Sequence, residues 1–75
     1  MTIDHLRLLQ DCMAILRLTN AEVLKAKIDF VDLEYEDIIV TVLETTRPEQ
    51  YKQKNAVYTV KASDIVSVQR IPEAD

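Results

Sequence analysis

Glycine is absent from this sequence of 75 residues, and cysteine and histidine occur only once each, as Cys12 and His5. A lone cysteine excludes a disulfide within the chain and fits a reducing, intracellular setting. A single histidine without a second soft ligand nearby gives no zinc-type site. Because there is also no glycine-rich elbow, the sequence contains no recognisable set of nucleophile, base and oxyanion donor. We therefore expect no metal site, no cofactor, no catalytic residue and no enzymatic activity.

Basic charge and long apolar runs are also scarce. The chain has 13 acidic and 9 basic residues, and its net charge of −4 argues against a binder of double-stranded DNA. No apolar run is as long as a membrane span, and Asp4 stands where a signal peptide would carry positive charge. The sequence thus predicts a cytoplasmic protein that binds neither membranes nor double-stranded DNA.

What the chain does have is enough apolar material for one core. Hydrophobic residues make up 48% of the sequence, so we expect residues 1–75 to form a single domain. A chain of this length buries only about 60% of the surface that it exposes when unfolded. With neither a disulfide nor a metal to support it, such a small domain needs partner chains, which predicts oligomerisation.

The N-terminal segment shows helical periodicity. Ile3, Leu6 and Leu9 fall on one face, which predicts a helix over residues 2–11. Helix propensity alone would prolong this helix. However, the stretch that follows ends in turn-forming residues, so we assign residues 14–19 to a strand.

Extended segments dominate the rest of the chain. Residues 22–32 alternate with period two, which predicts a strand whose apolar face carries Leu24, Ala26, Ile28 and Phe30. Runs rich in β-branched residues predict three further strands, at residues 38–45, 57–61 and 66–71. Five short strands in about 60 residues are too few for two full sheets. The predicted fold is therefore mainly β, a small and strongly bent five-stranded sheet that closes on itself behind an N-terminal helix.

Two segments resemble the signature motifs of the Sm/LSm family, which includes the Hfq-like proteins. In the first motif, Ala26, Ile28 and Asp32 stand where the family has a glycine, a hydrophobic residue and an aspartate. Tyr35 and Glu36 take the places of its methionine and asparagine. The resemblance extends from the N-terminal helix to the fifth strand, and it implies an Sm-like barrel.

The second family motif is an aliphatic residue, an Arg-Gly pair and a further aliphatic residue. In this chain it reads Val60-Lys61-Ala62-Ser63-Asp64-Ile65. Both signature glycines are alanine, the smallest change available, which preserves a close approach of the backbone. The Tyr-Lys-His signature of the Hfq-like proteins is absent.

The resemblance implies a homo-oligomeric ring, in the pentamer to heptamer range, that binds short single-stranded RNA. Tyr35 would stack on a base, and Lys61, in place of the motif arginine, would contact a phosphate or a base edge. Glu36 places a negative charge where RNA-binding members present a neutral amide. The polar loop after residue 46 mixes cations with an aromatic residue, which is typical of nucleic-acid contacts. Its candidate phosphate contacts are Arg47, Lys52 and Lys54.

A second function fits the same residues. Lys61 is also interpreted as a solvated strand residue, and Tyr35 as a side chain that caps the barrel end. The acidic residues between Asp29 and Asp37 match no ordered metal-binding loop, and they predict a solvated or partner-repelling face. The acidic charge, Glu36 and the lost Arg-Gly pair favour an Sm-like protein-interaction or regulatory module without RNA binding.

The last two predicted strands are the candidate edges of the sheet. Unpaired edges invite uncontrolled association unless they are covered, and these two carry few charges. A head-to-tail contact between the two edges of successive copies would satisfy both and would close into a ring. The candidate interface residues are Val57, Tyr58, Thr59, Val60, Val66, Ser67, Val68 and Gln69.

Overall fold

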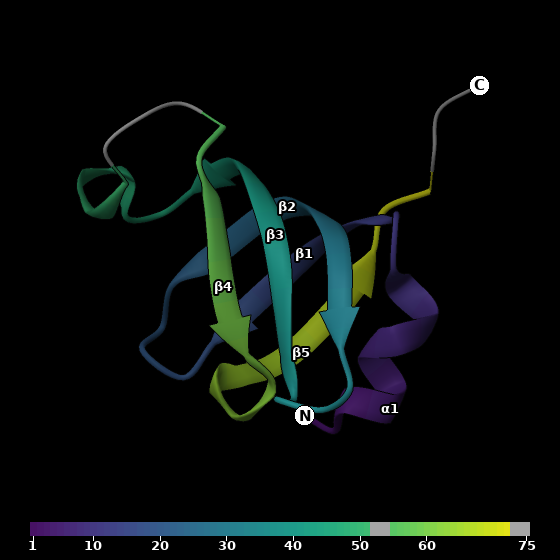
Figure 1. Cartoon of the computed structure of the whole chain (residues 1–75). Coiled ribbons are helices and arrows are strands. Elements are labelled where there is room, and N and C mark those ends of the chain that lie inside the picture. The colour runs from purple at the N-terminus through teal and green to yellow at the C-terminus, as the bar shows by residue number, and fades with distance from the viewer. Residues whose placement is uncertain (52–54, 73–75) are drawn as a thin grey trace.

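A computed structural model describes residues 1–51 and 55–72 of the chain. Five antiparallel strands form one sheet, with a short N-terminal helix at its side (Figure 1), which confirms the mainly β prediction. The elements are α1 Ile3–Leu6, β1 Met13–Leu18, β2 Val23–Asp32, β3 Asp37–Thr45, β4 Val57–Lys61 and β5 Ile65–Arg70. The described part of the chain also contains three single 3₁₀ turns, namely η1 Arg7–Leu9, η2 Pro48–Gln50 and η3 Ala62–Asp64. Each strand begins and ends within one residue of its predicted bounds.

The N-terminal helix is shorter than predicted. α1 continues directly into η1, and the chain leaves the helical conformation at Gln10. Ile3 and Leu6 are buried, which confirms the predicted apolar face. The helix does not reach residue 11, because Asp11 has a φ of 68° and its amide donates to the Ile28 carbonyl at 2.7 Å. The amide is thus part of the sheet and is not available to a helical ladder.

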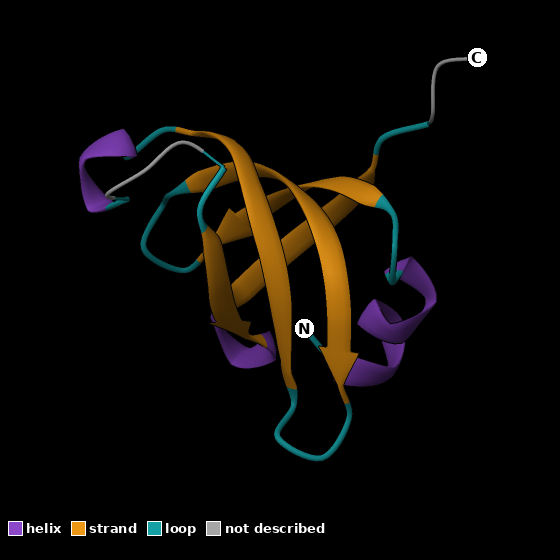
Figure 2. Cartoon of the chain, turned by 45° about the horizontal axis from the view of Figure 1, so that its top comes forward, coloured by secondary structure: helices purple, strands orange, loops and turns teal. Residues whose placement is uncertain are grey.

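The strand order in the sheet is β4-β3-β2-β1-β5, so the last strand returns to pair with the first. The sheet is strongly bent, and β3 and β4 lie across β1 and β5 with the core between them (Figure 1 and Figure 2). Among the described residues β4 and β5 are paired on one side only, so the expected closure of the sheet is wrong for a single copy. Turn η3 redirects the chain away from β4, and β5 satisfies its backbone on β1 instead. The largest fully buried apolar side chains are Leu6, Leu16, Leu24, Ile28, Ile38 and Ile65.

A β-bulge in β2 reverses one predicted face. Ile28 pairs with Val40 and Phe30 with Ile39, so β2 advances two residues where β3 advances one. Beyond this shift Val31 is buried, whereas Phe30 is 47% exposed. The prediction that Phe30 belongs to the core face is therefore wrong, because a bulge changes which side chains point inward.

The chain has no glycine, so other residues adopt the left-handed backbone conformation at its turns. Among residues 1–51 and 55–72, those with positive φ are Asp11, Ala21, Glu36 and Asn55. Aspartate and asparagine tolerate this region well, whereas Ala21 and Glu36 meet a steric cost from their Cβ atoms. Ala26 and Ala62 are buried and have no positive φ, so neither position needs the backbone freedom of glycine.

Candidate functional site

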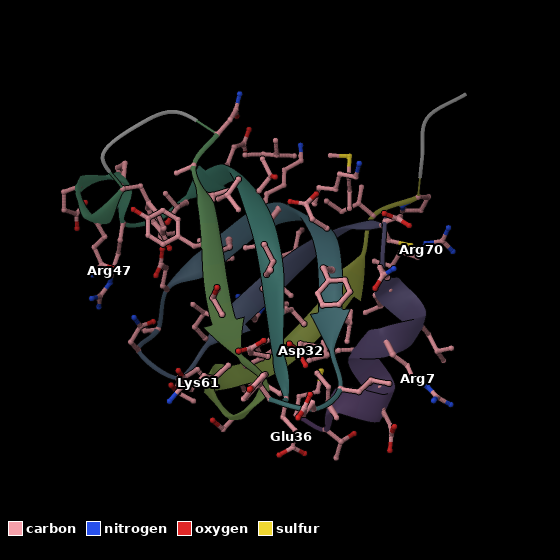
Figure 3. The ribbon with its side chains drawn as sticks, viewed as in Figure 1. Arg7, Asp32, Glu36, Arg47, Lys61 and Arg70 are labelled. Carbon is pink, nitrogen blue, oxygen red and sulfur yellow. The ribbon has the colours of Figure 1, made fainter. Side chains whose placement is uncertain are left out.

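The β2–β3 turn and the β4–β5 link meet at one end of the sheet (Figure 3). Asp37 pairs with Lys61 at the ends of β3 and β4, and the Ala62 amide donates to the Glu36 carbonyl at 3.0 Å. These contacts gather three of the sequence-predicted RNA contacts, Tyr35, Glu36 and Lys61, around one surface hollow of about 480 Å³. Residues 1–4 complete its wall, and we call it the Tyr35 hollow.

The turn that carries Tyr35 is held by the side chain of Asp32. One carboxylate oxygen of Asp32 accepts the amides of Glu34 and Tyr35, at 3.0 and 3.1 Å. This is the usual way in which an aspartate side chain fixes a turn two or three residues ahead. The Tyr35 ring is 74% exposed, so the fixed turn presents an aromatic surface to solvent.

Carboxylates outnumber cations in the segments that build this end of the sheet. Lys61 is the one lysine or arginine in the segments 1–6, 32–37 and 61–65 that build this end of the sheet. The acidic residues of the same segments are Asp4, Asp32, Glu34, Glu36, Asp37 and Asp64. The N-terminal ammonium donates hydrogen bonds to the carbonyls of Ala62 and Ile65, at 3.2 and 3.1 Å. The summed field at this end is negative, and it attracts cations and repels phosphates.

The structure does not bring Arg47 to this place. Arg47 follows the end of β3, whereas Lys61 pairs with the start of β3, so the two lie at opposite ends (Figure 3). The Arg47 guanidinium donates to the Asn20 carbonyl at 3.0 Å, which fixes it against the β1–β2 turn. The other two loop candidates, Lys52 and Lys54, lie outside the described residues.

A buried carboxylate, which the sequence did not reveal, lies directly before β2. Glu22 is 2% exposed, and one of its oxygens accepts the hydroxyls of Thr45 and Tyr51, at 2.5 and 2.8 Å. Burial, together with the hydrogen bond to Glu22, raises the pKa of the Tyr51 hydroxyl above its usual range. The hydroxyl therefore stays protonated and remains a donor. No spacing in the sequence links Glu22 to a tyrosine 29 residues away.

The two candidate interface strands are the two edges of the observed sheet, as predicted. Each edge carries an exposed valine, Val57 on β4 at 63% and Val66 on β5 at 62%. Tyr58, Val60 and Val68 are half-buried and pack against the core. The remaining candidates have polar side chains, Thr59, Ser67 and Gln69. Both edges thus combine free backbone groups with apolar side chains.

Within residues 1–51 and 55–72, no group of three or more His, Cys, Asp or Glu side chains is placed to hold a metal ion. No helix of these ranges is long and apolar enough to cross a membrane. No protein-family model, curated protein or solved structure matches the chain. The function is therefore inferred from the geometry and from the resemblance to the Sm motifs.

Proposed function

We propose that this chain is an Sm-like subunit that assembles into a homo-oligomeric ring and acts as a protein-interaction module. The observation that carries the proposal is the pair of open edges, β4 and β5, at the two ends of one strongly bent sheet. Unpaired edges with exposed valines present free backbone groups and apolar side chains, which favour pairing with a further strand. Pairing β4 of one copy with β5 of the next covers both edges and, with a fixed rotation, closes a ring.

Assembly of this kind would also stabilise a chain this small. A domain of 75 residues has a small core, and burial of two further edges per copy adds apolar contacts that one copy cannot make alone. The alanines at both motif glycines, Ala26 and Ala62, are compatible with the close backbone packing of an Sm-like barrel.

The charge around the Tyr35 hollow favours a protein partner with a basic segment. Lysine or arginine side chains of such a segment would pair with Glu36 and Asp37 and stack on the Tyr35 ring. A ring presents the same hollow once per subunit, so even weak contacts to a repeated or extended partner add up.

Binding of single-stranded RNA is a second candidate, and the exposed Tyr35 ring beside Lys61 favours it. Stacking of a base on an aromatic ring contributes about 1–3 kcal/mol. Each close pair of like charges opposes this by about 1 kcal/mol in water. With six carboxylates and one lysine at this end of the sheet, repulsion of the RNA backbone offsets the stacking. We therefore place RNA second.

Three measurements on the wild-type chain test the proposal. Size-exclusion chromatography coupled to light scattering, at micromolar concentration, should give the molar mass of a cyclic oligomer. A monodisperse monomer would refute assembly. Fluorescence anisotropy with a Lys/Arg-rich peptide, and filter binding with oligo-U, oligo-A and a mixed RNA across a salt series, then compare the two ligand classes. Peptide binding without RNA binding supports the first candidate. RNA binding with a steep salt dependence, and no peptide binding, favours the second.

A further inference from the structure

The outer face of the sheet carries an aromatic side chain that the bulge in β2 turns outward. Phe30 is the single phenylalanine of the chain, and the alternation of β2 up to Ile28 would place it in the core. The register shift between Ile28 and Phe30 buries Val31 instead and leaves Phe30 47% exposed. Bulges re-aim side chains in this way and are frequent beside functional sites. The sheet thus presents its phenylalanine to solvent.

Phe30 is one end of a short apolar strip that crosses β2, β3 and β4. Ile39 pairs with Phe30 and is half-buried, and it faces outward because its neighbours Ile38 and Val40 are buried in the core. On β4, Val57 lies diagonally across from Ile39 and is 63% exposed. Diagonal neighbours on one face of a sheet are close enough to be covered by the same ligand. We call Phe30, Ile39 and Val57 the outer strip.

The charges beside the outer strip indicate what kind of segment covers it. The Asp29 carboxylate accepts the hydroxyl of Thr41, an outward-facing residue of β3, at 2.5 Å, so Asp29 lies on the same face as Phe30. Three carboxylates flank the Phe30 end of the strip, and two lysines lie farther along the strands: Asp29, Asp32 and Asp37 against Lys27 and Lys61. Apolar side chains among carboxylates are complementary to a segment that is both apolar and basic.

We propose that the outer strip binds a large apolar side chain of the basic partner segment, an inference that rests on the protein-interaction role proposed above. Asp37 lies two residues before Ile39, about 7 Å along β3. Its partner on β4, Lys61, lines the Tyr35 hollow. A segment of a few residues therefore reaches both places, with its apolar side chain on Phe30 and its cations on the flanking carboxylates. The chain thus selects basic segments that also carry an apolar residue.

Two fluorescent peptides of equal charge test the inference. Both have the same lysine and arginine residues, and one has leucines where the other has serines. Fluorescence anisotropy should show that the wild type binds the leucine peptide about five- to tenfold more tightly, because a leucine side chain leaves water on the strip. Phe30→Ser should remove this preference without changing the affinity for the serine peptide. Leu8→Ser is the matched control and should keep the preference, since Leu8 is 78% exposed on η1, outside the sheet.

A charge variant gives a second readout that does not depend on the aromatic ring. Asp29→Asn should weaken the binding of both peptides about two- to fivefold, as expected for the loss of an exposed ion pair. The amide oxygen still accepts the Thr41 hydroxyl, so the bulge keeps its hydrogen bond. Glu44→Gln is the matched control, because Glu44 is exposed at the opposite end of β3 and should change neither affinity.

The outcomes separate this inference from the function on which it rests. If the wild type binds both peptides equally, or if Phe30→Ser keeps the leucine preference, the outer strip is not the contact and the protein-interaction role stands. If the wild type binds neither peptide, that role fails and the inference fails with it. If Phe30→Ser changes the oligomeric state in light scattering and leaves the leucine preference intact, the strip packs between copies, which also overturns the inference.

Discussion

The hydroxyl of Tyr51 donates a 2.8 Å hydrogen bond to the buried carboxylate of Glu22, and this bond ties the β3–β4 loop to the start of β2. A carboxylate that is 2% exposed needs donors, and Thr45 supplies the second. The same tyrosine packs on Tyr58 of the edge strand β4. A buried acid in the interior of one copy thus determines the shape of the surface that a second copy would meet.

Removal of the Tyr51 hydroxyl should destabilise the fold. Tyr51→Phe leaves the Glu22 carboxylate with one hydroxyl donor where it had two, at an expected cost of about 1–3 kcal/mol. The free energy of unfolding in urea measures the change. Tyr35→Phe is the matched control, because the Tyr35 side chain is 74% exposed and its loss of a hydroxyl should change stability little. Equal stability of the two variants would contradict the role given to Glu22.

Alkaline pH should weaken the fold through the same residue. The pKa of the Tyr51 hydroxyl is raised in the folded chain, chiefly by burial and then by the hydrogen bond to Glu22, above the usual tyrosine value of about 10. Folding therefore favours the protonated phenol, and this contribution is complete below about pH 10 and is lost as the pH rises further. Melting temperatures between pH 8 and pH 11 should fall more steeply for the wild type than for Tyr51→Phe. Parallel curves would argue against the prediction.

The sequence predicts the strands well because period-two alternation is a local property of extended backbone. The motif resemblance names Tyr35 and Lys61 as candidate RNA contacts, and the structure places both residues at one hollow. The sequence-based prediction fails at Phe30, where a bulge shifts the register, and bulges leave no clear mark on the alternation. The sequence does not predict that Arg47 lies against the β1–β2 turn or that Glu22 is buried beside Tyr51, because both positions depend on pairing between distant segments.

A glycine at position 21 should stabilise the chain. Ala21 has a φ of 72°, a conformation in which a Cβ atom costs about 1–2 kcal/mol. The greater freedom of glycine in the unfolded chain offsets part of this, so Ala21→Gly should gain about 1 kcal/mol or slightly less. Ala26→Gly is the contrast, because Ala26 is buried in β2 without a positive φ and should lose stability. Chemical denaturation measures the free energy of unfolding of both variants. If both substitutions lower it, backbone strain at Ala21 is unimportant.

Two substitutions at the Tyr35 hollow separate the candidate ligands. If RNA binds there, Lys61→Ala should lower its affinity for every sequence and reduce the salt slope by about one phosphate contact. Glu36→Asn should raise RNA affinity by removing repulsion, and should lower the affinity for a basic peptide. Filter binding and anisotropy give the two affinities. If neither substitution changes the affinity for RNA or for the basic peptide, the hollow is not the binding site.

Val68→Pro should release the assembly while the subunit remains folded. The amide of Ile71 donates to Met13 on β1, and amides along a strand alternate in direction. The Val68 amide, an odd number of residues away, therefore points to the open edge, where a neighbouring β4 would accept it. Proline removes that donor and adds bulk at the seam, without removing a bond to β1.

Val68→Ala is the matched control for this last substitution. It loses a similar amount of half-buried apolar contact but keeps the amide, so it should still assemble. Light scattering reports the oligomer, and circular dichroism reports whether each variant remains a β-sheet protein. A folded Val68→Pro variant that assembles like Val68→Ala would exclude β5 as a paired strand of the interface. A folded proline monomer beside an assembled alanine variant would identify the backbone ladder, and not side-chain packing alone, as the contact that joins the subunits.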